Sequence, residues 1–178
     1  MPLVLGDYTH RIMTVVTYQI RTATLDDVDA LVRHRIAMFT DMGLAFDAPA
    51  LDRAFRDWLA VEMPAGTYHA WLVETGDGQI AAGGGLSVLP WPPGPQYMGD
   101  RIAVVYNVYT ERAHRRRGLA RQLMETIHAW CRNAGVASIA LNASQDGRPL
   151  YESMGYHLPS SPMMFFAFAA GYNPSAQA

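Results

Sequence analysis

One stretch, residues 102 to 141, limits the fold of this chain more than any other. Ile102 to Thr110 is an uninterrupted strand-like run, and Gly118 to Ala134 carries apolar residues at helical spacing. Asn133-Ala-Gly135 supplies a helix stop, and Val136 to Leu141 reads as a short strand. Strand, helix and strand in succession predict an α/β fold, in which the helix packs through Leu119, Leu123, Ile127 and Trp130.

The residues before this stretch predict a strand and two helices. A β-branched run, Thr14 to Ile20, favours a strand. Thr24 and Asp27 then have the spacing of an N-cap and a capping acid ahead of a first apolar helical stripe. A second helix is predicted to follow Asp47.

A hairpin and several short elements complete the expected fold. Tyr68 to Glu74 and Gln79 to Leu89 flank Thr75-Gly-Asp-Gly78 and should pair antiparallel. Near the end, Gly147 to Met154 is expected to form a short helix, followed by closing strands over Tyr156–His157 and Met163–Phe168. We therefore predict one mixed α/β domain over residues 1–178, with a mostly antiparallel central sheet flanked by helices. Residues 1–13 would be a loose extension and 171–178 a flexible tail.

Composition excludes several functions. The 14 basic residues are all arginine, so lysine-dependent phosphate loops and Schiff-base enzymes are excluded. Cys131 is the only cysteine, which rules out an internal disulfide and, with six scattered histidines, gives no reason to expect a metal site. A formal charge of −2 gives no support for a nucleic-acid or membrane partner, and the first ten residues do not resemble a secretory signal, so we expect a cytoplasmic protein.

An arginine-rich turn joins the predicted strand to the predicted helix. Its position leaves backbone N–H groups free at the helix N-terminus, and such groups bind anions. Gly118 allows a ligand to approach the backbone closely, and the small Ala120 keeps the first turn open. Four arginines, at positions 115, 116, 117 and 121, add donors suited to phosphate. Taken alone, such a run is more often a solvated basic face.

A second polar segment follows the short strand. Asn142 and Ser144 are two residues apart and therefore share one face where the strand ends. Tyr151 follows on the predicted short helix, where its ordinary role would be that of a buried tyrosine with a hydrogen-bonded hydroxyl.

Together the two segments resemble the GNAT acyltransferases, which move an acetyl group from acetyl-CoA to an amine. The phosphate motif of that family, Arg/Gln-x-x-Gly-x-Gly/Ala, is matched by Arg115, Gly118 and Ala120. Its later motif, Leu-Tyr-x-x-x-Gly-Phe/Tyr, is matched by Leu150, Tyr151, Gly155 and Tyr156. The resemblance implies a GNAT-like fold and a cosubstrate site for acetyl-CoA. In that site Val108 and Thr110 would offer backbone groups to pantetheine, and residues 115 to 121 would hold the pyrophosphate. The implied cofactor-binding residues are Val108, Tyr109, Thr110, Arg115, Arg116, Arg117, Gly118, Leu119, Ala120, Arg121, Asn142 and Ser144.

The resemblance also implies catalytic roles. Tyr151 would lie near the CoA sulfur as the general acid. Many members carry Asn at the position of Ser144, so either Ser144 or Asn142 would contact the cofactor. The strand Ile102 to Thr110 contains no acid, and the candidate base is Glu111 at its end, with a water relay through Tyr106 or Asn107 as the rival.

An N-acetyltransferase acting on a small amine or a peptide amine is the function these residues favour. The alternative is a module that binds acyl-CoA as a sensor or regulator without turnover. A homodimer through the C-terminal strands would be ordinary for the family. The acceptor could lie in an apolar groove between the first helices and the proline-rich loop, although core packing is the simpler role for its helical members. The candidate groove residues are Met38, Phe39, Met42, Trp58, Trp91 and Tyr97.

Overall fold

The computed structural model describes residues 16–95, 97–160 and 163–164, and it is built around one five-stranded sheet. The strands, in spatial order, are β1 (Tyr18–Thr22), β2 (Tyr68–Thr75), β3 (Ile80–Pro90), β4 (Arg101–Thr110) and β5 (Ile139–Leu141). Neighbouring strands are antiparallel except for β4 and β5, which are parallel. The predicted mixed α/β class is therefore confirmed.

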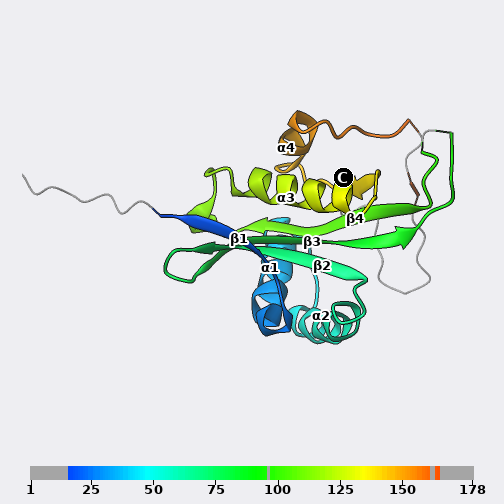
Figure 1. Cartoon of the computed structure of the whole chain (residues 1–178). Helices are drawn as coiled ribbons and strands as arrows, with labels where there is room; N and C mark the ends of the chain where they lie inside the picture. The colour runs from blue at the N-terminus through cyan, green and yellow to red at the C-terminus, as the bar shows by residue number, and fades with distance from the viewer. Residues whose placement is uncertain (1–15, 96, 161–162, 165–178) are drawn as a thin grey trace, which may run out of the picture.

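Two layers of helices cover the sheet. In Figure 1 the helices α1 and α2 lie on one face and α3 and α4 on the other. Their bounds are α1 (Val28–Asp41), α2 (Ala48–Glu62), α3 (Leu119–Asn133) and α4 (Arg148–Ser153), with 3-10 turns η1 (Leu25–Asp27) and η2 (Arg112–His114). Each layer has its own apolar core, one between the sheet and α3 and the other between the sheet and the pair α1–α2.

The N-terminal helices begin where their caps predict. Thr24 accepts a hydrogen bond from the Asp26 N–H at 3.3 Å, and Asp27 accepts one from the Thr24 N–H at 2.8 Å, which completes a capping box. Asp47 caps α2 by accepting from the Ala50 N–H at 2.9 Å. Both helix predictions are confirmed, with a 3-10 first turn ahead of α1.

The first strand lies further along the chain than the β-branched run predicts. Tyr18 pairs with Thr75, the last residue of β2, so Val16 and Thr17, the described residues before it, have no β2 residue opposite them, and residues 14–15 of the predicted run lie outside the described residues. Val16 and Thr17 accordingly lie outside β1. β-propensity favours extended backbone, but the length of the partner strand decides where a ladder ends.

Small residues in the middle of β3 let both layers approach the sheet closely. A Cβ atom on Gly83 would come within 2.9 Å of His34 on α1, and one on Gly84 within 3.0 Å of Leu123 on α3. These positions therefore require glycine for packing, and they bring side chains of both layers next to the centre of β3.

The predicted closing strand Tyr156–His157 is wrong. The Tyr156 N–H donates to the Tyr151 carbonyl at 3.0 Å, and its hydroxyl lies 2.7 Å from His128 Nε2 on α3. These contacts cap α4 and hold the segment against α3 instead of beside β5. Of the strand predicted at 163–168, Met163 and Met164 are not in a strand and the rest lie outside the described residues, as do the predicted extension 1–13 and tail 171–178.

Candidate functional site

β4 and β5 part halfway along β4. Their parallel pairing ends at Val105 and Leu141, whereas β4 continues to Thr110. Beyond that point, in the described residues, β4 pairs with β3 only. Val108, Tyr109 and Thr110, the residues implied to bind pantetheine, all lie in this part of the strand. The edge of β4 that faces away from β3 therefore has backbone groups available to a ligand.

A β-bulge interrupts β4 at the same place. Tyr109 lies opposite Gly83 and Tyr106 opposite Gly85, so two residues of β4, Asn107 and Val108, face a single residue of β3. Asn107 has a φ of 58°, a left-handed conformation that asparagine tolerates better than most residues. Because of the bulge, consecutive residues Tyr106 and Asn107 both lie on the α1–α2 face.

Asn107 is buried in a short polar chain on that face. Its Nδ2 donates to the Tyr68 hydroxyl at 3.3 Å, and its Oδ1 accepts from Arg35 Nη1 at 2.5 Å. Burial raises the pKa of Tyr68 to about 12, so the phenol stays protonated at neutral pH. The bulge is thus fixed by side chains from α1 and β2.

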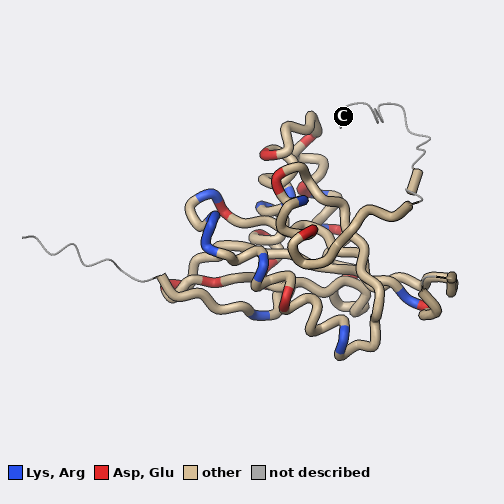
Figure 2. The backbone as a smooth tube through the Cα atoms, turned by 90° about the horizontal axis from the view of Figure 1, so that it is seen from above, with Lys and Arg blue, Asp and Glu red and all other residues tan. Residues whose placement is uncertain are grey.

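The turn before α3 presents free backbone N–H groups. The Gln122 N–H is the first to bond within the helix, to the Gly118 carbonyl at 3.1 Å, so the three N–H groups before it have no intrahelical acceptor. Arg116 and Gly118 both have left-handed backbone, with φ of 62° and 78°. A Cβ on Gly118 would meet nothing within 4 Å, so the approach to these groups is open. Figure 2 shows the run of basic residues on this turn. The arrangement fits an anion.

The side chain of Arg115 is already engaged within the protein. Its guanidinium forms an ion pair with Asp41 at the end of α1, and its Nε donates to the Thr110 carbonyl at 3.0 Å. Arg112 pairs with the same carboxylate, and the two guanidinium groups lower the pKa of Asp41 to about 2. Arg115 therefore joins the turn to α1, and its predicted phosphate contact would come from the backbone or require this pair to open.

The other three arginines of the turn differ in whether their side chains are free to contact a ligand. Arg121 donates to the Ser153 hydroxyl at 2.6 Å and so ties α3 to α4. Arg116 and Arg117 are exposed, and neither forms an ion pair within the described residues. These two side chains are the ones free to meet a phosphate.

The two polar residues that follow β5, Asn142 and Ser144, lie in different environments. Ser144 accepts a hydrogen bond from the Gly147 N–H at 3.1 Å and so supports the turn that starts α4. Asn142 is exposed directly after the last β5 residue. Both follow the point where β4 and β5 part, and which of them contacts a ligand stays a prediction.

Tyr151 is a largely buried residue of α4. It is 9% exposed and packs in the α3 core with its ring edge-on to Tyr156. Burial raises its pKa to about 12. No hydrogen bond to its hydroxyl is found within the described part of the chain. A protonated hydroxyl with no partner in the described residues can donate a hydrogen bond to a ligand that reaches it.

Glu111 lies past the end of β4 and is held by α1. It is four residues beyond Asn107, roughly 13 Å along an extended strand at ~3.3 Å per residue. Its Oε1 accepts from Arg33 Nε at 3.1 Å and lies 3.3 Å from Nε2 of His34, without hydrogen-bond geometry to that ring. Burial lowers the pKa of His34 to about 4 although Glu111 opposes the shift, so the imidazole is neutral.

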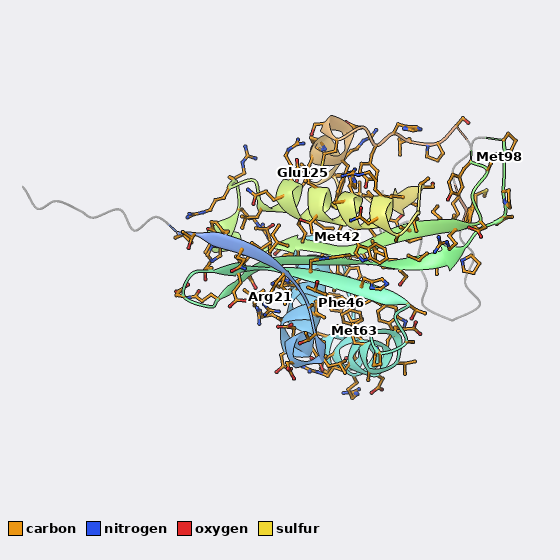
Figure 3. All side chains as sticks on the ribbon, in the orientation of Figure 1. Arg21, Met42, Phe46, Met63, Met98 and Glu125 are labelled. Carbon is orange, nitrogen blue, oxygen red and sulfur yellow. The ribbon has the colours of Figure 1, made fainter. Side chains whose placement is uncertain are left out.

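A pocket of about 260 Å³ opens on the α1–α2 face directly beside the bulge. Of the acceptor residues predicted from the sequence, only Trp58 lines it. Tyr97 instead donates to the Arg101 carbonyl at 2.6 Å within its own loop, and Figure 3 shows Met98 of the same loop far from α1 and α2. The lining residues are Arg35, Leu51, Ala54, Phe55, Trp58, Tyr106 and Asn107.

A larger hollow of about 500 Å³ lies near the end of β4, but its charges compensate each other. Arg56 pairs with Asp29 and Asp52, and Arg112 pairs with Asp41. The smaller pocket is therefore the better candidate for binding an acceptor, because its one charged side chain lacks an acidic partner.

Sequence reasoning missed Arg35, although a signal was present. Arg35 follows Leu31 and Val32 by four and three residues and precedes Phe39 by four, so it lies on the apolar stripe of its helix. A charged residue on an apolar stripe indicates a buried polar role. Asn107 was considered only as part of a water relay, since nothing in an unbroken strand pattern marks a bulge.

Comparison with known proteins identifies the family. Residues 30–156 match the acetyltransferase (GNAT) family. Among solved structures, a GCN5-related N-acetyltransferase from Ralstonia eutropha JMP134 is 34% identical with a TM-score of 0.76, over 84% of this chain and 99% of that one. The chain therefore belongs to the GNAT acetyltransferase family, as the two motifs indicated.

More distant structures share the fold. A predicted acetyltransferase with acetyl-CoA from Clostridium acetobutylicum has a TM-score of 0.77 at 22% identity, over 84% of this chain and 96% of that one. Glucosamine-6-phosphate N-acetyltransferase from Arabidopsis thaliana has a TM-score of 0.61 at 18% identity, over 86% and 99%. No curated protein matches the sequence. In the part of the chain that the structure describes, every helix falls short of the length and apolar character that a membrane crossing requires.

Proposed function

We propose that this protein transfers an acetyl group from acetyl-CoA to a primary amine of a small molecule or peptide. The observation that carries the proposal is the parting of β4 and β5 after Val105 and Leu141, in line with an open helix N-terminus at Gly118. One continuous site can then hold an extended ligand with a phosphate at one end. The similarity to an N-acetyltransferase at 34% identity supports amine transfer.

In this proposal the pyrophosphate of CoA lies on the turn from Arg115 to Arg121. The free N–H groups at the start of α3 and the exposed guanidinium groups of Arg116 and Arg117 supply its donors. The pantetheine arm lies along Val108 to Thr110 and takes the place of a strand partner. Asn142 or Ser144 contacts the arm from the β5 side.

The reaction is a direct attack. The amine nitrogen bonds to the thioester carbonyl carbon, the C–S bond breaks, the amine loses a proton and the sulfur gains one. A primary amine with a pKa of ~10.4 is deprotonated to roughly one part in 10³–10⁴ at pH 7, a handicap of about 4–5 kcal/mol. A base or a water relay must therefore take the proton.

Tyr151 serves as the donor to the sulfur. Its pKa of about 12 keeps it protonated at every physiological pH. Full proton transfer from Tyr151 to a thiolate whose thiol pKa is ~8.5 is uphill by roughly three and a half pKa units, so the main contribution of Tyr151 is a hydrogen bond that stabilises the developing thiolate. Glu111 remains the proposed base, but it lies roughly 13 Å along the strand from Asn107, so it would receive the proton through water; a water chain along Tyr106 and Asn107 without Glu111 is its rival.

A screen of primary amines with acetyl-CoA, followed by release of free thiol, tests the proposal. An N-acetylated product identified by mass spectrometry supports it. If calorimetry shows CoA binding while no amine in the screen releases thiol above the rate of hydrolysis, the non-catalytic acyl-CoA sensor is the better description. Glu111→Gln separates the two alternatives, because only Glu111 as the final proton acceptor predicts a loss on the order of 100-fold in turnover.

A further inference from the structure

The pocket beside the β4 bulge has one feature that an apolar amine would not need. Arg35 reaches it from α1 with its guanidinium half-buried between two phenyl rings, 4.7 Å from the centre of Phe55 and 5.0 Å from that of Phe39. Nε of Arg35 is fully enclosed and has no hydrogen-bond partner. In the described residues its polar side-chain partner is Asn107, and no carboxylate pairs with it.

A charge in this position is costly without a counterion. Burial in an apolar setting disfavours the charged form, and it lowers the pKa of Arg35 from its usual value. An arginine nevertheless stays charged at neutral pH. Other arginines on α1 and α2 show the contrast, since Arg33 pairs with Glu111 and Arg56 with two aspartates.

The position of Arg35 limits how far its anion can lie from the reacting amine. Its Nη1 is 2.5 Å from the Oδ1 of Asn107, which directly precedes Val108 on the proposed pantetheine edge. An anionic group bound there lies next to the point where the amine must attack. In the acceptor, the two groups must therefore be neighbours, as they are when one carbon separates them.

The wall of the pocket that α2 supplies is apolar, opposite Tyr106 and Asn107 of β4. Leu51, Ala54, Phe55 and Trp58 come from α2, and Trp58 stacks edge-on against Tyr68. About 260 Å³ is smaller than the ~300–1,000 Å³ of pockets for drug-sized ligands, so it suits a small side chain. A sugar or a polyamine would leave its polar groups unpaired against this wall.

From these observations we propose that the acceptor is an α-amino acid with an apolar or aromatic side chain, whose carboxylate is bound by Arg35. The two terminal nitrogens of the guanidinium can offer parallel donors to a carboxylate, because each carries two N–H groups and Asn107 accepts from only one of them. The side chain lies against Phe55 and Trp58, and the amine is directed across the bulge toward β4. The inference rests on the proposed N-acetyltransferase activity and specifies its acceptor.

Matched acceptor pairs test the role of the carboxylate. L-phenylalanine with 2-phenylethylamine, and L-leucine with 3-methylbutylamine, differ only in that group. Wild-type enzyme is expected to favour the amino acid on the order of 100-fold in kcat/KM, the value of a charged bidentate contact. Arg35→Met should remove this preference by raising the KM of the amino acid, Arg35→Lys should restore part of it, and Arg53→Met, an exposed arginine on α2, should preserve it.

Binding provides a readout that does not depend on turnover. The complex with CoA, titrated calorimetrically with L-phenylalanine or L-leucine, should bind the amino acid in wild type and Arg53→Met but not in Arg35→Met. Such binding without acetylation would support the carboxylate site while refuting the proposed transfer. Equal use of the two members of each pair, or equal affinity in Arg35→Met and wild type, would overturn the carboxylate site and leave the transferase proposal standing. Circular dichroism of each variant identifies any that fails to fold, and Arg35→Lys then carries the test.

Discussion

The candidate sites on the two sides of β4 are made of different chemical groups. On the side that faces the α3 turn, the candidate cofactor site consists mainly of backbone: the edge of Val108 to Thr110, which has no strand partner among the described residues, and the open N–H groups after Gly118. On the α1–α2 side, the candidate acceptor pocket consists of side chains, from Arg35, Phe55, Trp58 and their neighbours.

This difference has a physical reason. Every acyl-CoA carries the same pyrophosphate and pantetheine, and backbone groups that recognise them do not depend on side-chain identity. Acceptors differ in charge and shape, so recognising one needs side chains that can vary without changing the fold. In our proposal, one strand thus carries a general site for the cosubstrate and a specific site for the acceptor on its two sides.

The strongest test of the backbone site is Gly118→Val. Valine adds a branched side chain at a φ of 78° and places it in the space through which a phosphate must approach. CoA affinity is expected to fall by about 100-fold or more, measured by calorimetry.

Gly66→Val is the matched control. Gly66 has a φ of 69° and is equally free of close neighbours, but it lies between α2 and β2. The two variants should lose similar stability, and only the first should lose CoA binding. Wild-type CoA affinity in folded Gly118→Val would show that this turn does not hold the pyrophosphate.

The next test asks whether the candidate cofactor site also contains a side chain that the acetyl transfer requires. Tyr151→Phe keeps the buried ring and removes the hydroxyl, so turnover should fall on the order of 100-fold with CoA affinity nearly unchanged. Because the pKa of Tyr151 is raised to about 12, wild-type activity should show no loss from its ionisation as pH rises from 7 to 10. Tyr156→Phe removes a neighbouring hydroxyl that bonds to His128 and should leave turnover close to wild type. Equal turnover in Tyr151→Phe and wild type would make Tyr151 a packing residue.

The same contrast explains what the sequence could predict. Backbone sites need glycine and fixed spacing within a short segment, so Arg115, Gly118 and Ala120 were recognisable from local order alone. Helix caps at Thr24 and Asp47 are local for the same reason, and both were confirmed.

The acceptor pocket could not be predicted in this way. It joins α1 and α2 to β4, which lies far from them in the sequence, and its position depends on a bulge at Asn107 that no residue pattern marked. The later start of β1 and the lack of a strand at Tyr156–His157 have a related cause. In both places the neighbouring strand, and not the β-propensity of the segment itself, decides whether a ladder forms.

A smaller effect is expected from the side chains that border the backbone site. Alanine at both Asn142 and Ser144 should raise the KM for acetyl-CoA by about 5- to 10-fold, the value of one or two modest hydrogen bonds. The single variants sharpen the assignment, because Ser144→Ala also loses its bond to the Gly147 N–H and should lower the melting temperature. Asn142→Ala should not change stability, since Asn142 is exposed. If the double variant keeps the wild-type KM, the cofactor site is made of backbone and the α3 turn alone.

The smallest effect is expected from the ion pairs of Asp41, which connect α1 to the turn before α3. Asp41 at the end of α1 pairs with Arg112 and Arg115 and accepts from the Tyr109 hydroxyl at 3.2 Å, so it fastens the acceptor-side helix to the cofactor-side turn. Asp41→Asn should cost about 0.5–1 kcal/mol of unfolding free energy at pH 7, as expected for a solvent-accessible ion pair.

The pH dependence of that cost identifies its origin. The two arginines lower the pKa of Asp41 from 3.8 to about 2, so the native state holds the ionised form more strongly than the unfolded chain does. The stabilisation is therefore fully present above about pH 4 and is lost as pH falls toward 2. Urea unfolding of wild type and Asp41→Asn should differ at pH 7 and converge near pH 2. Asp100→Asn, whose exposed carboxylate lies 3.6 Å from Arg101, should match wild type throughout. A difference between wild type and Asp41→Asn that persists unchanged at low pH would mean that the asparagine acts through packing, and that charge does not couple the two sides of β4.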